Sequence, residues 1–243
     1  RITINGPRLQ EYFKELSRET FQKGDLITVG EAWGADTERA KLYSNPDGSE
    51  FSMVFQFEHI GLDQKEGGEK WDLAPLPFKK LKKIMAHWQN ELYNCGCLFW
   101  DNHDLPRIVS RWGNDREYRV ESAKMLAILL HGMQGTPYIY QGEELGMTNV
   151  QYDIEDYKDC EIINMYHERL EKGYSKDEIM KSIYAKGRDN ARTPMQWDDS
   201  ANAGFTTGTP WIKVNDNYDK INAKSQVDDP DSIFSCYKKL VQL

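Results

Sequence analysis

Short apolar runs alternate with amphipathic stretches along the first 140 residues. This alternation constrains the fold more than any other feature of the sequence. Each run predicts a β-strand, and each stretch predicts a helix of about 7–17 residues. Strands that alternate with helices are typical of an α/β protein with a parallel sheet, because parallel strands need a crossover connection between them. The expected strands cover residues 26–30, 52–57, 97–100 and 137–140, and the expected helices cover residues 7–21, 37–43, 78–93 and 118–133.

The helix expected over residues 118–133 carries apolar side chains around most of its circumference. Such a distribution predicts a helix that is largely buried. Beyond Met147 the alternation stops, and we interpret residues 141–230 as one long insertion after the fourth strand that folds over the mouth of a pocket. The elements expected there and beyond are surface helices over residues 161–171 and 176–185 joined at Gly173, a loop-rich segment over residues 187–210 and a final helix from residue 233.

The balance of charges argues against a nucleic-acid-binding protein. The chain has 31 basic and 39 acidic residues, which gives a net charge of −8, whereas proteins that bind nucleic acids present basic faces. No apolar run reaches the roughly 18 residues that span a bilayer, and no signal peptide is visible. We therefore expect a cytoplasmic protein that binds neutral ligands, with neither nucleic acid nor membrane as a partner.

The four cysteines show neither the paired spacing of a metal site nor a disulfide framework. Cys95 and Cys97 are separated by one glycine, which is compatible with a redox pair. The favoured interpretation is that both are small apolar residues buried where a strand begins. The sequence therefore predicts no metal site.

Two of the expected strands end on acidic side chains. The run Leu98-Phe99-Trp100 stops at a polar segment that contains His103 and Asp104, and the earlier strand ends on Glu31 with Gly30 beside it. The carboxyl ends of parallel strands meet at one edge of a sheet, so these side chains are candidates for a common site. A histidine next to a carboxylate can bind sugar hydroxyls or transfer protons, and a glycine lets a ligand approach the backbone closely.

Five stretches carry a family resemblance, namely Thr28–Gly34, Ser52–His59, Phe99–Arg107, Gly135–Asn149 and Gly187–Trp197. They resemble the α-amylase superfamily of glycoside hydrolases, in the branch of oligo-1,6-glucosidases and dextran glucosidases. The last stretch is specific to the α-glucosidase side of that superfamily. Together the stretches extend over residues 25–205, which is most of the chain.

The resemblance implies the second half of a (β/α)8 barrel, with strands five to eight followed by the long helical and loop insertion. The N-terminal half barrel and a C-terminal β domain are absent from the sequence, as is the Gly-Phe-Arg-x-Asp motif whose Asp is the family's nucleophile. A structural calcium site of the family would lie in the absent half, so we expect no cofactor in this chain. The strands of Glu31 and Tyr138 would have open edges, through which we expect self-association or covering by a rearranged segment.

The resemblance also implies roles for residues at the strand ends. Glu31 is the implied general acid/base, which protonates the glycosidic oxygen and later activates water. Asp104 is the implied third acid, which holds ring hydroxyls and favours the distorted sugar. His103 would bind the same sugar, and Arg188 would fix the non-reducing-end glucose, which makes the enzyme exo-acting.

Three further residues are implied at outer positions of the site. Trp33 would form a wall of the leaving-group subsite. Lys70 and Glu161 lie where the dextran-cleaving members place residues that contact the second and third glucose. Without the family, these two residues are equally well interpreted as a solvated lysine and as a carboxylate favoured by the dipole at a helix N-terminus.

One position departs from the family pattern. Asp101 stands where many relatives have Asn, and it is expected to add an acid close to His103 and Asp104. The sequence leaves three outcomes open, because such an acid can lower activity, shift the pH optimum or simply be tolerated.

The leading hypothesis is a retaining, exo-acting α-glucosidase that hydrolyses α-1,6 bonds at the non-reducing end of isomalto-oligosaccharides or dextran. The same scaffold serves α-1,4-glucosidases, sucrose isomerases and trehalose-6-phosphate hydrolases, of which the last needs basic residues for its phosphate. A non-catalytic barrel relative that acts as a binding or chaperone subunit is the alternative from another class. Because the nucleophile motif is absent, we expect the 243-residue chain to be inactive by itself.

Overall fold

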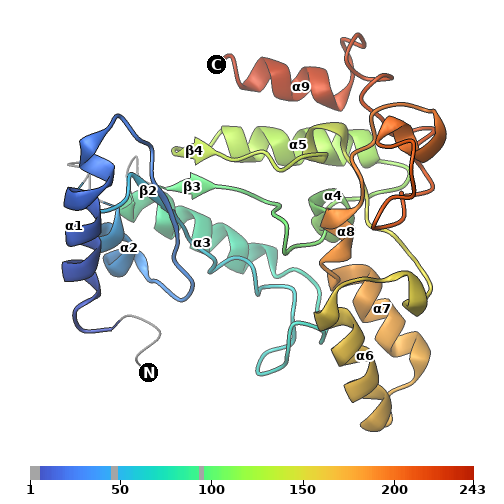
Figure 1. Cartoon of the computed structure of the whole chain (residues 1–243), viewed down its shortest axis with the longest axis horizontal. Coiled ribbons are helices and arrows are strands. Elements are labelled where there is room, and N and C mark those ends of the chain that lie inside the picture. The colour runs from blue at the N-terminus through green and yellow to red at the C-terminus, as the bar shows by residue number, and fades with distance from the viewer. Residues whose placement is uncertain (1–5, 45–48, 93–95) are drawn as a thin grey trace. The chain divides into compact units, whose positions relative to one another are not determined.

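The computed structural model describes residues 6–44, 49–92 and 96–243, which fall into two compact units (Figure 1). Cys95 lies outside the described residues, and each unit is described by itself. The first, which we call the strand unit, contains the chain up to residue 63 together with residues 74–98 and 133–138. The second, which we call the helical unit, contains residues 64–73, 99–132 and 139–243.

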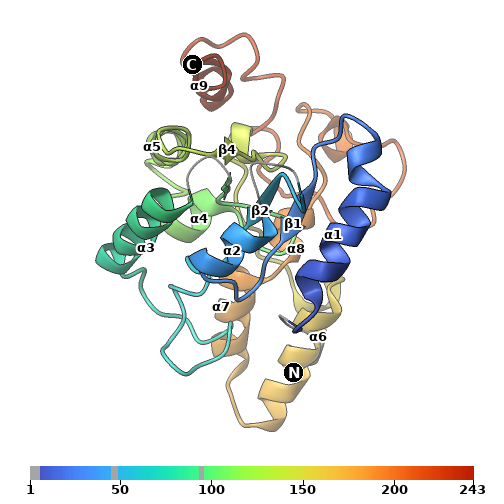
Figure 2. The ribbon, with the colours of Figure 1, turned by 90° about the vertical axis from the view of Figure 1, so that its left-hand side faces the viewer.

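The strands of the strand unit are parallel and follow one another in chain order. β1 pairs with β2 in a register that sets Gly30 opposite Val54, and β3 pairs with β4 in a register that sets Leu98 opposite Pro137. A parallel bridge between Val54 and Gly96 connects the two pairs. The predicted succession of four parallel strands is therefore confirmed. The strands are β1 (Val29–Glu31), β2 (Met53–Phe55), β3 (Cys97–Leu98) and β4 (Thr136–Pro137) (Figure 1 for β3, Figure 2 for the others).

The strands are shorter than the sequence predicts, most clearly at the start of β1. Pairing begins at Val29 rather than at residue 26, and both Leu26 and Ile27 are exposed. The Thr28 N–H donates to Ser52 Oγ at 3.1 Å, and the Ser52 N–H donates to Thr28 Oγ1 at 3.0 Å. The Thr28 carbonyl also accepts from the Ser52 and Met53 N–H groups at 3.0 and 3.2 Å, so Thr28 is held to the next strand by both its backbone and its side chain.

The α-helices of the strand unit agree with the predicted ones to within a few residues. α2 begins where the Asp36 side chain accepts a hydrogen bond from the Arg39 N–H at 2.9 Å. The Phe13 ring of α1 makes edge contacts with Tyr43 and Phe51, at centroid distances of 5.9 and 5.0 Å. The helices are α1 (Leu9–Glu19), a 3-10 turn (Phe21–Lys23), α2 (Thr37–Tyr43) and α3 (Phe78–Glu91).

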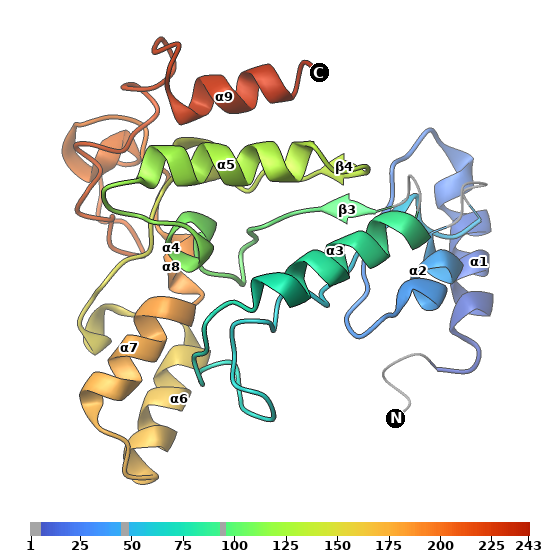
Figure 3. The ribbon, with the colours of Figure 1, turned by 180° about the vertical axis from the view of Figure 1, so that it is seen from behind.

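In the helical unit, α6 (Cys160–Glu171) and α7 (Lys176–Lys186) lie side by side (Figure 3). Gly173 joins them with φ of 85°, a left-handed conformation that suits glycine at a helix end. A reciprocal pair of hydrogen bonds between Ser175 and Glu178 then caps the start of α7. The predicted helix pair joined at Gly173 is confirmed, and its shared core includes Ile162, Met165, Ile179 and Ile183.

The helix α5 (Arg119–His131) packs along α9 (Ile233–Leu240) (Figure 3). Small residues of α5 make this contact, because Ala123 and Ala127 lie in one core cluster with Ile233 and Tyr237. The prediction that the helix over residues 118–133 is largely buried is wrong. An apolar circumference does not determine how many neighbours cover it, and three apolar side chains of α5 are 50%, 56% and 42% exposed, namely Met125, Ile128 and Leu129.

Several short helical segments were missed by the sequence patterns, since elements of three to five residues are too short to show a helical period. No helix among the described residues is long and apolar enough to cross a membrane. Cys97 is buried, and burial raises the pKa of its thiol to about 12, so this cysteine serves packing. The missed segments are α4 (Ile108–Trp112), α8 (Asp189–Arg192) and 3-10 turns over Glu143–Leu145, Ile154–Asp156 and Ala201–Gly204.

Candidate functional site

In the strand unit, two predicted site residues lie at the carboxyl end of β1. Glu31 is the last residue of the strand, and its side chain is exposed. Two residues later, the Trp33 ring stacks on Phe57 at a centroid distance of 4.1 Å and an interplanar angle of 12°. The stacked ring remains largely exposed, so β1 presents an acid and an aromatic surface at one strand end.

Gly30 does not have the role expected for it. A Cβ atom placed on Gly30 would meet the side chains of Val54 and Phe51 at 3.4 and 3.5 Å. Those distances are ordinary van der Waals contacts to apolar neighbours. The glycine therefore faces the packing around β2, and the expectation that it opens the backbone to a ligand is wrong.

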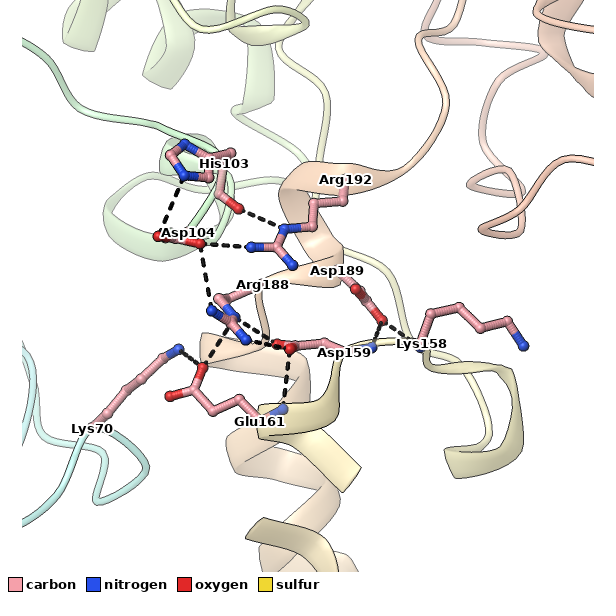
Figure 4. A network of polar contacts seen from close by, with 9 residues as sticks. All are labelled: Lys70, His103, Asp104, Lys158, Asp159, Glu161, Arg188, Asp189 and Arg192. Atoms are coloured by element: carbon pink, nitrogen blue, oxygen red, sulfur yellow. Dashed lines mark hydrogen bonds and ion pairs between the residues drawn. The ribbon is translucent and has the colours of Figure 1, made fainter. Parts of the chain in front are cut away.

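In the helical unit, Asp104 lies between positive side chains (Figure 4). Arg192 Nη2 donates to Asp104 Oδ1 at 2.6 Å, and Arg188 Nη1 lies 3.7 Å from the same oxygen. The other oxygen, Oδ2, lies 3.4 Å from His103 Nε2. The predicted pairing of His103 with Asp104 is present, and Arg188 is brought to it from 84 residues further along the chain (188 − 104).

Asp159 holds the guanidinium of Arg188 in a two-pronged hydrogen bond. Arg188 Nε and Nη2 donate to its two carboxylate oxygens at 2.8 and 2.5 Å. Burial raises the pKa of Asp159, but the hydrogen bonds from Arg188 and the Glu161 N–H together with the positive charges of Arg188 and Arg192 leave that pKa below its ordinary value. The same contact raises the pKa of Arg188, so both groups stay ionised. Arg188 is thus fixed in orientation rather than mobile.

Lys70 and Glu161, which the sequence left undecided, form an ion pair beside Arg188. Lys70 Nζ donates to Glu161 Oε2 at 2.7 Å, and Arg188 Nε lies 3.2 Å from that oxygen. Lys70 also lies over the Trp71 ring at 4.8 Å from its centroid, and Ser182 Oγ donates to the Trp71 carbonyl at 2.8 Å. The pairing argues against a freely solvated lysine at position 70.

Sequence reasoning missed Arg192 and Asp159. Arg192 follows Arg188 by four residues, which places it on the same side of a short helical turn, so spacing alone could have suggested it. Asp159 is also a helix cap, because its side chain accepts from the Glu161 N–H at 3.1 Å. Asp189 supports that cap by accepting from the Lys158 and Asp159 N–H groups at 2.7 and 3.0 Å.

The charges of this cluster, which we call the Arg188 cluster, cancel. Its three cations and three carboxylates face one another, and each is a hydrogen-bonding group with unused donor or acceptor directions. Such a balanced surface can bind neighbouring hydroxyls of a neutral sugar, donating from the guanidinium groups and accepting at the carboxylates. The members are Lys70, Asp104, Asp159, Glu161, Arg188 and Arg192 (Figure 4).

Asp101 is not part of the Arg188 cluster, although the sequence placed it close to His103 and Asp104. Its side chain is fully buried, and burial raises the pKa of its carboxyl to about 7 despite the nearby positive charges of Arg107 and Arg111. Burial and the neighbouring Asp101 also raise the pKa of Glu143 well above its ordinary value. Glu143 accepts a hydrogen bond from the Tyr237 hydroxyl at 2.6 Å.

We expect this buried acid pair to make stability depend on pH. The folded chain holds the Asp101 proton more tightly than the unfolded chain, so the stability from protonation is present below about pH 4 and is lost as the pH rises to about 7. An amide does not titrate, so Asp101→Asn should lose stability less steeply than wild type between these pH values. Urea unfolding midpoints across the range test this, and equal slopes for the two proteins would contradict it.

Among the described residues, no group of three or more His, Cys, Asp or Glu side chains could hold a metal ion. The Arg188 cluster cannot do so either, because each of its carboxylates is within an ion pair with Arg or Lys.

The chain is similar to known proteins over its whole length. A family model described as "Alpha amylase, catalytic domain" matches residues 1–243. The oligo-1,6-glucosidase of Parageobacillus thermoglucosidasius is 58% identical over 247 residues, which cover 100% of this chain and 44% of the relative. The glucan 1,6-alpha-glucosidase of Streptococcus pneumoniae is 57% identical over 248 residues, with coverage of 100% and 46%.

A solved structure is also closely similar. The trehalose-6-phosphate hydrolase of Bacillus licheniformis aligns with a TM-score of 0.93 and 52% identity, covering 98% of this chain and 43% of the other. This chain therefore spans less than half the length of the relatives that it matches.

Proposed function

Because the chain belongs to the alpha-amylase catalytic-domain family, we propose that it contributes to a retaining, exo-acting α-glucosidase that hydrolyses α-1,6 bonds of isomalto-oligosaccharides or dextran. Its parallel strands and helices are part of a (β/α)8 barrel. The observation that carries the proposal is the charge-balanced Arg188 cluster around Asp104, which offers donors and acceptors to the hydroxyls of one sugar ring. Similarity to oligo-1,6- and glucan 1,6-glucosidases supports the linkage.

In this proposal, each residue acts on the bond or on the terminal glucose. Glu31 protonates the glycosidic oxygen and then, as a carboxylate, takes a proton from the attacking water. Asp104 and His103 form hydrogen bonds with the ring hydroxyls. Arg188, which is held by Asp159, recognises the non-reducing end of the sugar. Trp33 supports the leaving group.

The outer sugars are proposed to contact Lys70 and Glu161. These two residues lie at the edge of the Arg188 cluster and present one donor and one acceptor. Residues 141–230 are proposed to act as the insertion that shapes this part of the site. Because the relatives extend well beyond the matched region, the nucleophile is proposed to come from a segment outside these 243 residues.

A chimera tests the proposed function. Residues 1–243 replace the matching part of the Parageobacillus thermoglucosidasius relative, and the substrates are isomaltose, maltose, sucrose and trehalose 6-phosphate. We expect the 243-residue chain alone to release no glucose above its Glu31→Gln control, and the chimera to prefer isomaltose. A preference for maltose or trehalose 6-phosphate would show that the α-1,6 assignment is wrong. Hydrolysis by the isolated chain would contradict the need for a nucleophile from outside it.

Trehalose-6-phosphate hydrolase is a specific alternative because of the close structural match. A phosphate dianion favours a surplus of positive groups. The three cations of the Arg188 cluster are all engaged by carboxylates, which favours a neutral sugar over a phosphorylated one.

Two further proposals concern the self-association of the chain and its location in the cell. Within the described residues, β1 and β4 each pair with a single strand, and their free edges are proposed to pair with another copy when the chain is isolated. Light scattering of the chain at high concentration tests this, and a strict monomer would contradict it. We also propose that the protein is cytoplasmic, where its substrate would be short oligosaccharides imported into the cell.

A further inference from the structure

A hollow of the helical unit lies outside the Arg188 cluster. It has a volume of about 510 Å³, within the range of small-ligand sites, and is lined by Asp156, Lys158, Asn202 and several residues between 209 and 218. Trp211 is its largest side chain and is 74% exposed. We call this hollow the Trp211 groove.

The exposure of Trp211 is built into the fold. The next residue, Ile212, is buried in the core beneath α6 and α7. The carbonyl of Lys213 accepts a hydrogen bond from the buried Tyr152 hydroxyl. Because its neighbours anchor the backbone on the core, the indole of Trp211 is held outward. An exposed aromatic face on an anchored backbone is a surface on which the apolar face of a sugar ring can stack.

The charged groups of the groove are balanced in sign. Asp156 and Asp216 line it together with Lys158 and Lys213. Lys213 Nζ lies 3.8 Å from Asp156 Oδ2, and both side chains remain about half exposed. Donors and acceptors of both kinds beside an aromatic face suit a neutral, hydroxyl-rich ligand better than an anion or a cation.

The rim of the groove is shaped by an uncommon backbone conformation. Asn202 has φ of 55°, a left-handed value that is infrequent outside glycine, and Ala203 has φ of 56°. The Asn202 amide donates to the carbonyls of Thr206 and Gly208 at 3.1 and 3.0 Å. These bonds fix the loop that leads to Trp211, so the rim is formed before any ligand arrives.

The groove begins one residue away from the Arg188 cluster. The Lys158 side chain lines the groove, while its backbone N–H donates to Asp189 beside Asp159. Figure 4 shows the Lys158 side chain extending away from Asp159 and Arg188. The two sites are therefore adjacent in the helical unit but use different side chains.

We propose that the Trp211 groove is an accessory binding site for a neutral α-glucan, which holds a second stretch of a long isomalto-oligosaccharide or dextran chain. This inference rests on the proposed function for the identity of the sugar. The indole stacks on one glucose ring, and the acidic and basic side chains bond its hydroxyls. The site supplies retention of polymer rather than catalysis, so it should matter for dextran and not for short substrates.

The test is affinity electrophoresis of the 243-residue chain in gels that contain dextran. All variants carry Arg188→Met, so that retention at the Arg188 cluster is removed. We expect dextran to retard this protein and Trp211→Ala to weaken the retention about tenfold, as expected for the loss of one stacked ring. Asp216→Asn should weaken it less, and Phe205→Ala, an exposed aromatic of the same segment outside the groove, should leave it unchanged.

Equal retardation of the Arg188→Met protein with and without Trp211→Ala, or no retardation at all, would overturn the groove assignment. The outcome is separable from that of the proposed function. If the chimera hydrolyses no isomaltose while Trp211-dependent retention persists, the hydrolase assignment fails and the groove stands. If the chimera hydrolyses isomaltose without Trp211-dependent retention, the groove assignment fails alone.

Discussion

Replacing Glu31 by Gln in the chimera is expected to lower kcat for isomaltose hydrolysis by a factor of about 10²–10⁴. Glutamine has nearly the same shape as glutamate, but its amide cannot give a proton to the departing glycosidic oxygen. Substrate binding should be little affected, because Glu31 is proposed to act on the bond rather than to hold the sugar. Steady-state kinetics on isomaltose measure kcat and KM separately.

The leaving group supplies the internal control for this prediction. A nitrophenyl α-glucoside needs little protonation, so Glu31→Gln should lower the rate of its first chemical step far less than that of isomaltose. Glu38→Gln removes an exposed acid of the same unit and should leave both rates near wild type. An equal loss on both substrates would mean that residue 31 acts through structure or binding and is not the acid.

Replacing Arg107 by Ala is expected to destabilise the helical unit by roughly 3–5 kcal/mol, because one side chain supplies several hydrogen bonds and each buried group left unsatisfied costs about 1–3 kcal/mol. The side chain is almost fully buried. Its guanidinium donates to the carbonyls of Gln141, Asn190 and Ala191 at 2.6, 3.1 and 3.2 Å. The substitution leaves these carbonyls and the buried Asp101 without the group that compensates them.

Urea unfolding monitored by tryptophan fluorescence measures this loss. Exposed Arg116→Ala is the matched control and should change stability by less than about 0.5 kcal/mol. Adding Asp101→Asn to Arg107→Ala should recover part of the stability, because the uncompensated buried acid is then removed as well. An Arg107→Ala chain as stable as the control would show that the guanidinium does not join these segments.

The local patterns of the chain predicted most of its long helices. The helix over residues 37–43 has its expected bounds, since Asp36 supplies an ordinary cap. The strands were predicted in the right order but too long, because Leu26 and Ile27 are apolar yet lie exposed before Val29, the first paired residue of β1. The burial of α5 was overestimated, since an apolar pattern on Met125 and Ile128 does not show which neighbours are present to cover them.

The Arg188 cluster could be predicted only in part. The family motifs identified Asp104 and Arg188, but Asp159 was invisible as a functional residue because a capping aspartate is common at helix ends. Its second role depends on Arg188, which reaches it across 29 residues of sequence. Asp101 illustrates the opposite case, because closeness in sequence to Asp104 suggested a place in the site, whereas its side chain lies in the core beside Arg107.

The proposed function depends on Glu31 and the Arg188 cluster acting on one sugar. A crystal structure of the Glu31→Gln chimera soaked with isomaltose tests this most directly. We expect the non-reducing glucose to contact Asp104 and Arg188, with its glycosidic oxygen within hydrogen-bond distance of the side chain at position 31. Isomaltose bound away from Asp104, or a glycosidic oxygen out of reach of position 31, would contradict it.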